Sequence, residues 1–541
     1  MLRSRTAAAA SLLLIPLVAG GFLLQKAPAT ATPRLFDQVM SLVANRYVDS
    51  LQGSAIFEKA AHGLVRELND PYSELLAPKQ NDEFNRSVGG RYGGVGMLLE
   101  EQKTTGTTSV VVSRVFPHTP AEEGGVREGD RIVQVDTLPV VDMKIDKVSD
   151  ALRGIAGTTV RVTFARPGVA EPVKLSFKRS VIHVPAVPFA TMLGDKVGYI
   201  PLQTFNENAA EEVEAAAAKL MNEGARGIVL DLRDNGGGIV DQSLAVSSLF
   251  LKGGQAIVNV RSRNAPEEVA RASGDRLATQ PPMIVLTDGG SASASEIVAG
   301  SLQDHDRALV LGTTSFGKGL VQSVFPLERG YALKITTGKW YTPSGRSIHR
   351  ERTLLPDGRY VEARPDSLET EAEKRARPKY SSDAGRTVYG GGGITPDLIV
   401  PDDTLLTTEQ EFLKSIAPKA QAFVTVLNQY AFELKGSAPR TFTVTPAWRA
   451  ELRRRLSAAG VTTDAKYEPA ATRILDRELD RRVARLVLGD AAAKQRALPD
   501  DHQLARAVNL LAAASTQEQL FAAAGVTSAA SAQRSTSANQ R

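Results

Sequence analysis

Three serines and a glutamate follow an apolar segment near the middle of the chain. Residues 281–288 (PPMIVLTD) pass through two glycines into SASASE (291–296), and helical spacing of apolar residues continues from there. A strand, a tight turn and a helix in this order place a hydroxyl at the carboxyl edge of a sheet, beside unpaired helix N–H groups. Ser293 therefore has two interpretations: a nucleophile, or the N-cap of a helix whose capping box ends at Glu296.

A serine nucleophile needs a group that accepts its proton. His305 lies twelve residues beyond Ser293. That is about 18 Å along a continuous helix, so this histidine is predicted to be structural. The other histidines stand in no suggestive context. Lys318, in TSFGKGLVQ (314–322), is flanked by glycines that let its side chain enter a crowded site. A lysine acts as a base only when burial lowers its pKa toward neutrality.

A third segment is predicted to reach the same sheet edge. LDLRDNGGG (230–238) joins an apolar strand to three consecutive glycines. Such a run can direct backbone N–H groups at the oxyanion that forms in acyl transfer. The alternative interpretation is an ordinary flexible loop between a strand and a helix.

Nucleotide binding is a rival interpretation of the lysine segment. GTTSFGK (312–318) fits the phosphate-binding pattern G-x-x-x-x-G-K, but Gly319 stands where a serine or threonine would hold magnesium. The following LVQSVFPL is β-branched and is a poor phosphate-binding helix. The chain has no cysteine, and its six histidines show no metal-binding spacing, so neither a metal nor another cofactor is expected.

Short β-branched strands separated by Gly and Pro turns occupy residues 89–179. YGGVGMLL (92–99) is a glycine-rich turn that runs into a strand, and a helix is predicted over 145–153. This order resembles a PDZ domain in its permuted bacterial arrangement, which binds a peptide as an added strand and holds its terminal carboxylate with backbone amides. The residues assigned to this grip are Val95, Gly96, Met97 and, lining the side-chain pocket, Val148.

Strands and helices alternate from about 197 to 400, which predicts an α/β layer with mostly parallel strands. The predicted fold class is a mixed α/β (α+β) core with an inserted β-rich PDZ-like domain and helical N- and C-terminal segments. The predicted units are a signal peptide or anchor (1–32), a helical segment (33–88), the PDZ-like domain (89–182), the α/β core with the serine and lysine segments (183–402, with a charged insertion at about 350–386) and a helical extension with a disordered tail (403–541).

The N-terminus is predicted to direct export. Arg3 and Arg5 precede an apolar run over 7–24, and small residues follow at 27–31. This length lies between a cleaved signal peptide and a single membrane anchor, so both remain open. The expected location is the periplasm or the outer face of the cytoplasmic membrane. Lys and Arg (65) are scattered among Asp and Glu (60), which gives no reason to expect a nucleic-acid partner.

Together these segments resemble the carboxy-terminal processing (tail-specific) proteases, a Ser–Lys peptidase family with a PDZ domain. The resemblance covers about 35–397, and its motifs are LNDPYSELL, LRDNGGG, SASASE with FGKG, KITTGKWYTPSGRSI and GGGITPD. It implies that Ser293 is the nucleophile, that Lys318 is its base and that Gln322 orients Lys318. The oxyanion amides implied by the resemblance are those of Gly237 and Ala294.

The resemblance implies an endopeptidase that forms an acyl-enzyme and takes polypeptides with free C-termini. An oligomer would be compatible with it. The alternative is a catalytically inactive PDZ adaptor of the cell envelope. Two residues depart from the family pattern: Gly236, where relatives often have proline, and Tyr72, where histidine is usual.

The proposed contact between Gln322 and Lys318 also constrains the backbone. Four residues of strand span about 13 Å, whereas one helical turn brings positions i and i+4 within about 6 Å. A turn of helix or an equivalent tight bend is therefore predicted across 319–321, with strand resuming near Val324.

Overall fold

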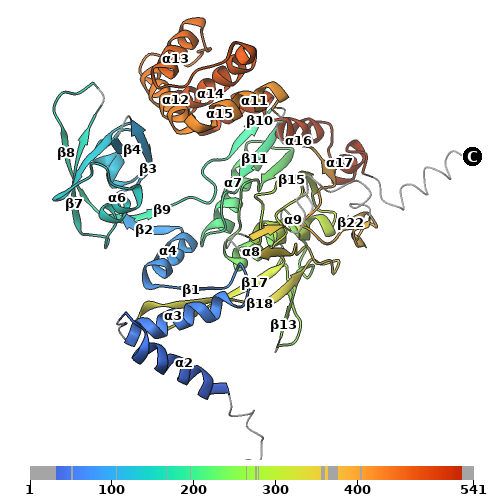
Figure 1. Ribbon diagram of the computed structural model, residues 1–541. Helices are drawn as coiled ribbons and strands as arrows, with labels where there is room; N and C mark the ends of the chain where they lie inside the picture. Colours follow the sequence, from blue (N-terminus) through green and yellow to red (C-terminus); the bar gives the residue numbers. More distant parts are fainter. Residues whose placement is uncertain are drawn as a thin grey trace, which may run out of the picture.

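A six-stranded sheet forms the centre of the computed structural model (Figure 1). The structure describes residues 32–526, apart from 50, 52, 105–106, 167, 195, 264, 275–276, 278–279, 355–359, 363–375 and 402–404. All neighbours in this sheet run parallel except β10, which pairs antiparallel with β11. In spatial order the strands are β10 (Thr191–Leu193), β11 (Val197–Pro201), β12 (Gly227–Asp231), β15 (Met283–Thr287), β16 (Leu309–Gly312) and β23 (Leu398–Ile399).

Helices from two distant parts of the chain cover this sheet. One hydrophobic cluster joins the strands to α7 (Ala209–Asn222), α8 (Val240–Phe250) and α9 (Ala294–Asp304). A second cluster joins them to α16 (His502–Ala512) and α17 (Gln517–Ala523). Leu504 and Leu511 of α16 are buried in it, and burying a leucine contributes roughly 1.5–3 kcal/mol. The last described helices therefore complete the core around the central sheet.

An antiparallel sheet attaches the N-terminal segment to the core. Its strands are β1 (Glu74–Leu76), β18 (Ala332–Tyr341), β13 (Ala256–Ser262) and β14 (Glu268–Arg271), with β17 (Leu320–Pro326) also paired to β18. The N-terminal helices are α2 (Thr32–Arg46), α3 (Gly53–Arg66) and α4 (Pro78–Gly89). Because β1 pairs with β18, the segment after α3 lies against the sheet that receives the lysine loop.

The PDZ-like unit is an insertion with its own core. Its sheet contains β3 (Met97–Thr104), β4 (Thr107–Val115), β5 (Arg131–Val135), β6 (Leu138–Pro139), β7 (Thr159–Ala165) and β8 (Val173–Lys178). Helices α5 (Pro120–Glu123) and α6 (Ile145–Leu152) complete the unit. The chain enters through β2 (Arg91–Gly94) and leaves through β9 (Ser180–His183), which pair antiparallel, so both connections run side by side.

A group of C-terminal helices forms another core and contacts the PDZ-like unit. It consists of α11 (Thr407–Ile416), α12 (Ala420–Lys435), α13 (Pro446–Ala458), α14 (Glu468–Leu488) and α15 (Asp490–Ala497). Arg114 of β4 donates two hydrogen bonds of 2.6 Å to the Asp490 carboxylate, and Lys435 of α12 lies 3.5 Å from Glu128. In Figure 1 these helices lie between the PDZ-like unit and α16.

The predicted fold class is confirmed: a mixed α/β core, a β-rich insertion before it and helices after it. The short strands β19 (Arg352–Leu354), β20 (Tyr360–Glu362), β21 (Lys379–Ser381) and β22 (Thr387–Tyr389) lie in or beside the predicted insertion, whose middle falls outside the described residues. The predicted export segment and the predicted disordered tail also fall outside them. None of the described helices has the length and apolar character that a bilayer-spanning segment needs.

Candidate active site

Ser293 occupies a strained turn between strand β15 and helix α9. It is the N-cap residue of α9, with φ 56° and ψ −112°. A side chain in this region of backbone space costs about 1–3 kcal/mol, and such strain persists only where surrounding contacts impose it. A sharp strand-to-helix turn of this kind exposes a hydroxyl at the top of the sheet, as nucleophilic serines require.

Hydrogen bonds distinguish the three serines of the SASASE segment. The Ser291 hydroxyl is buried and donates to the Leu232 carbonyl (2.8 Å), and the Ser295 hydroxyl is buried and donates to the Asn235 carbonyl (2.8 Å). Within the described part of the chain, the Ser293 hydroxyl makes no hydrogen bond. Of the three, Ser293 therefore has the hydroxyl that is free to react.

Glu296 joins the serine turn to the lysine loop. Its Oε2 accepts from the backbone N–H groups of Ser293 (2.8 Å) and Lys318 (2.9 Å). Its Oε1 accepts from the Ser315 hydroxyl (2.6 Å) and the Gly317 N–H (2.7 Å). Burial raises the pKa of Glu296, but these donors oppose the shift, and four donors around one carboxyl group fit its ionised form. The predicted capping glutamate thus also positions the loop that carries the lysine.

The Lys318 side chain enters a largely buried environment beside this carboxylate. Burial lowers the pKa of Lys318, Lys334 and Arg352 lower it further, and Glu296 and Asp70 oppose them. Its amine lies 5.0 Å from the centre of the Tyr72 ring. No hydrogen bond joins that amine to Ser293 in the part of the chain that the structure describes. The site therefore has a lysine whose pKa is lowered by burial and whose amine faces an aromatic ring.

Strand β18 fixes the backbone of the lysine loop. The buried Trp340 donates from Nε1 to the Lys318 carbonyl (3.0 Å) and from its backbone N–H to the Gly319 carbonyl (3.1 Å). A Cβ atom on Gly317 would lie 2.8 Å from Arg350 Cβ, and the φ of Gly317 is 87°, so glycine is required there. The KITTGKWY segment thus positions the lysine loop.

The prediction of a helical turn or tight bend across 319–321, before Gln322, is wrong. Strand β17 already begins at Leu320, and its pairing with β18 shows only a register shift between Val321 and Gln322. The β-branched sequence satisfies its backbone groups along the ten-residue partner strand, which a helical turn would leave unpaired. The Gln322 side chain donates to Thr336 Oγ1 (3.4 Å) instead of contacting Lys318.

The glycine run lies directly against the serine turn. A Cβ atom on Gly237 would lie 2.7 Å from the Ala292 carbonyl oxygen and 3.0 Å from both the Ala294 nitrogen and Ser293 Cβ. Ala294 is the first residue of α9, so its N–H has no partner within the helix. The contact explains why residue 237 must be glycine.

The expectation of a free Gly237 amide is not met. Its N–H donates to Asn235 Oδ1 (2.9 Å), because the asparagine side chain turns back on its own backbone two residues on. The Asn235 side chain also donates to the Leu202 carbonyl (2.7 Å) and its backbone carbonyl accepts from the Ala292 N–H (3.0 Å). In this arrangement the Gly237 N–H is not available to the predicted oxyanion.

An ion pair from the C-terminal region anchors the start of this loop. Arg233 donates to both carboxylate oxygens of Asp231, and also to those of Asp501 at distances of 2.9 and 3.0 Å. Burial opposes ionisation of Asp501, yet the Arg233 guanidinium holds its pKa well below the usual range. Asp501 is the N-cap of α16, so the helix that covers the core sheet also positions the loop before Gly237.

The residues of the predicted peptide grip lie together within the PDZ-like unit. Gly96 has φ 89°, and a Cβ atom there would lie 2.3 Å from Thr119 Cβ. Among the described residues, the N–H groups of Val95 and Gly96 have no acceptor. Met97 begins the edge strand β3, and Val148 of α6 is completely buried in the same core as Val95 and Met97. Val148 is therefore part of this core and has no exposed surface with which to line the predicted side-chain pocket.

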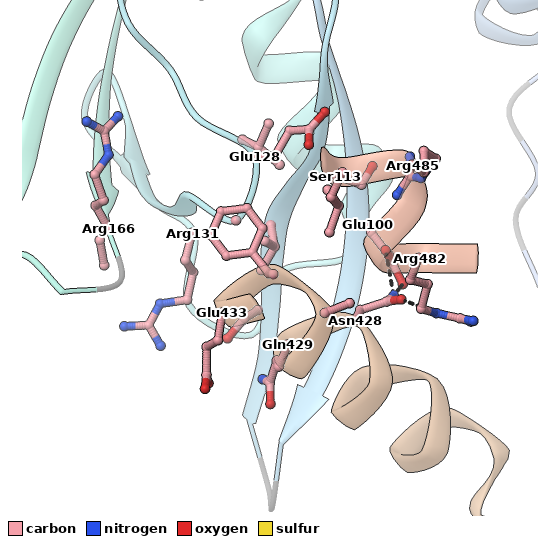
Figure 2. Close-up of a pocket in the computed structure, with 18 of the residues that line it drawn as sticks. Glu100, Ser113, Glu128, Arg131, Arg166, Asn428, Gln429, Glu433, Arg482 and Arg485 are labelled. Atoms are coloured by element: carbon pink, nitrogen blue, oxygen red, sulfur yellow. Dashed lines mark hydrogen bonds between the residues drawn. The ribbon is translucent and has the colours of Figure 1, made fainter. Parts of the chain in front are cut away.

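A separate cavity of about 540 Å³ lies between the PDZ-like sheet and helices α12 and α14. Figure 2 shows Asn428 bridging Glu100 of β3 and Arg482 of α14. The Gln421 side chain donates to the Glu101 carbonyl of β3 (3.3 Å). These polar contacts connect the edge strand of the predicted grip to the C-terminal helices.

Other predicted alternatives are also decided by geometry. His305 contacts Asp383 (2.7 Å) and the Ala256 carbonyl (2.7 Å), so it is structural, as predicted. The residues after Lys318 form strand β17, which removes the helix that nucleotide binding needs. Among the described residues, no group of three or more His, Asp or Glu side chains is placed to hold a metal ion.

Known proteins with similar sequences give the family. The model of peptidase family S41 matches residues 196–359, and that of the PDZ domain matches residues 111–166. A carboxy-terminal-processing protease of Bartonella bacilliformis is 38% identical over 320 residues, which cover 58% of this chain and 71% of that protein. The chain belongs to peptidase family S41.

Further S41 relatives carry the same description. The carboxy-terminal processing protease CtpA of Bacillus subtilis is 30% identical over 361 residues, 65% of this chain and 76% of the relative. A solved structure titled photosystem II D1 C-terminal processing protease covers 64% of this chain and 96% of its own, with 30% identity and a TM-score of 0.35. The sequence relatives carry the conclusion that this is a C-terminal processing serine protease with a PDZ domain.

Three contacts around the site were not predicted from the sequence. Glu296 was expected only to cap a helix, Tyr72 was expected to have no catalytic consequence, and no role was expected for Asp501. The segment Phe316-Gly-Lys-Gly gives no sign that it shares the Glu296 carboxylate with the serine turn, because Glu296 and Lys318 lie 22 residues apart in the sequence. Asp501 lies 268 residues from Arg233, beyond the reach of any local pattern.

We expect Glu296→Gln to lower kcat/KM by about 10–100-fold. The amide has one acceptor oxygen, so two of the four donors lose their acceptor, and an unpaired buried donor costs about 1–3 kcal/mol. Steady-state peptidase assays on the folded variant measure the loss. Glu409→Gln is the matched control, because Glu409 also caps a helix, α11, through the Leu406 N–H. Equal activity of the two variants would contradict the role given to Glu296.

Proposed function

We propose that this S41 protease cleaves peptides through an acyl-enzyme on Ser293, with Lys318 as the general base. The observation that carries this proposal is the Glu296 carboxylate, one oxygen of which accepts from both backbone N–H groups, at 2.8 and 2.9 Å. The lowered pKa of the half-buried Lys318 and the free hydroxyl of Ser293 support it. A catalytically inactive PDZ adaptor would not need the loops of Ser293 and Lys318 to be held by one carboxylate.

The chemistry follows from these positions. Neutral Lys318 accepts the Ser293 proton as the oxygen attacks the peptide carbonyl carbon. The oxyanion is proposed to receive the Ala294 N–H and, once Asn235 releases it, the Gly237 N–H. Collapse breaks the peptide bond, and the Lys318 ammonium gives its proton to the leaving amine. Water then enters, Lys318 takes its proton, and the ester is hydrolysed to free Ser293. Gln322 is proposed to orient Lys318 during these steps, after leaving Thr336.

Substrates are proposed to be polypeptides that present a free C-terminus to the PDZ-like unit. The amides of Val95, Gly96 and Met97 would hold the carboxylate, and the peptide would add to β3 as a strand. The positive φ of Gly96 and the unpaired amides of Val95 and Gly96 among the described residues support this assignment.

Export is proposed on the strength of the sequence before the described residues. Arg3, Arg5 and the apolar run over 7–24 support either a cleaved leader or a single anchor, with the protease in the periplasm or on the outer face of the cytoplasmic membrane. Association of protease chains is also proposed. Exposed apolar residues of α2, among them Leu35 (64% exposed) and Leu42 (61%), support it.

Substitution of the catalytic pair tests the mechanism. We expect Ser293→Ala to reduce cleavage to the background rate, and Lys318→Arg to lower kcat by about 10²–10⁴-fold, because a guanidinium stays protonated. Ser295→Ala and Lys466→Arg are matched controls and are expected to keep most activity. Cleavage of a fluorogenic peptide measures the rates. Residual activity in Ser293→Ala comparable to that of Ser295→Ala would refute the assignment.

Amidation of the substrate tests the grip separately. A peptide with an amidated C-terminus loses charge-assisted hydrogen bonds worth about 1.5–3 kcal/mol, so its Kd for Ser293→Ala protease should rise about 10–100-fold. Isothermal titration measures this difference. Gly96→Ala should remove it by blocking the loop, whereas Gly157→Ala, with φ 92° and open space around it, should preserve it. Equal affinities for acid and amide in the unmodified loop would exclude a carboxylate grip.

A further inference from the structure

Tyr72 presents its ring to the catalytic lysine from the N-terminal segment. It lies in the turn before β1, and its ring centre is 5.0 Å from Lys318 Nζ. Its hydroxyl accepts from Arg352 Nη1 (2.7 Å), and its backbone N–H donates to Asp70 Oδ1 (3.1 Å). The next residue, Ser73, accepts from the Thr336 N–H on β18 (3.0 Å). The ring is therefore held from both sides against the sheet that carries the lysine loop.

Arg352 connects this ring to the lysine loop itself. Its Nη2 donates to the Phe316 carbonyl (2.8 Å), and its guanidinium lies 3.8 Å from the centre of the Phe316 ring. The same guanidinium binds the Tyr72 hydroxyl. The Tyr72 hydroxyl and the Phe316 carbonyl, two positions before Lys318, thus accept from the same guanidinium.

We propose that Tyr72 is a positioning residue that holds the protonated amine of Lys318 on its ring and thereby sets the pH at which the protease becomes active. The face of an aromatic ring attracts an ammonium group and has much less attraction for a neutral amine. Loss of the proton therefore weakens the contact and frees the amine for Ser293. The inference rests on the proposed function, because it takes Lys318 to be the base.

The other groups around the amine allow this role. Lys334 and Arg352 disfavour its charge, and Glu296 and Asp70 favour it. Burial raises the pKa of Tyr72, so its phenol stays neutral and acts through its ring alone. Neutral Lys318 is the form that accepts the Ser293 proton. Because the ring favours the charged form, its removal makes the base available at lower pH.

The test measures the rate at which a fluorophosphonate labels the full-length protease, as a function of pH. Tyr72→Leu should move the midpoint of the acid limb to lower pH by about half a unit to one and a half units, since a cation–π contact of this kind and one pKa unit are of similar energy. Tyr72→Phe keeps the ring and loses the Arg352 hydrogen bond, so its midpoint should match the unmodified protease. Tyr467→Leu is the matched control, because Tyr467 lies 4.6 Å from the amine of Lys466.

An unchanged midpoint in folded Tyr72→Leu, or the same shift in Tyr72→Leu and Tyr72→Phe, would overturn the inference. Tyr72→Met is the second variant if Tyr72→Leu does not fold, and the same downward shift is expected of it. The variants Ser293→Ala and Lys318→Ala distinguish a failure of the catalytic assignment from a failure of the role proposed for Tyr72. Labelling that persists in either would overturn the catalytic assignment itself. Labelling lost in both, without a Tyr72 effect, would overturn only the role of Tyr72.

Discussion

The active site depends on one buried carboxylate. A charge taken out of water is expensive unless donors surround it, and Glu296 receives four hydrogen bonds from two loops. These bonds hold Ser293 in a backbone conformation that costs about 1–3 kcal/mol. They also fix the backbone of Lys318 relative to that turn. The carboxylate thus brings the Ser293 hydroxyl and the Lys318 amine into one site, although they lie on loops that follow two different strands, β15 and β16.

The described conformation has the nucleophile turn formed and its partners engaged elsewhere. The Lys318 amine lies on the Tyr72 ring, Gln322 donates to Thr336, and the Gly237 N–H donates to Asn235. Each of these three contacts is a single interaction of modest strength. Glu296, in contrast, accepts four hydrogen bonds in a buried position. The proposed mechanism therefore requires the Lys318 and Gln322 side chains and the Gly237 amide to change partners around a backbone that stays in place. Arg233, held by Asp501 of the C-terminal region, keeps the glycine loop attached during that change.

Local patterns in the sequence predicted much of this architecture. Strand–glycine–helix order placed Ser293 at the sheet edge, and the β-branched segments of the PDZ-like unit form strands as predicted. The failures came from contacts that no local pattern records. The bend before Gln322 was inferred from a side-chain contact, but pairing with β18 determined the backbone. The Gly237 amide was assigned by analogy, and the Asn235 side chain competes for it. The glycines around Lys318 and the exclusion of His305 favoured this lysine as the base, whereas the role predicted for Gln322 rested on the resemblance alone.

The most direct test of the account is the position of the covalent label after fluorophosphonate treatment, read by tandem mass spectrometry of the peptide that contains SASASE. The free hydroxyl predicts a label on Ser293, while Ser291 and Ser295 remain bonded to backbone carbonyls. Labelling should also fall in parallel with activity when Glu296 is replaced. A label on Ser291 or Ser295, or a full yield of label on Ser293 without Glu296, would contradict the account.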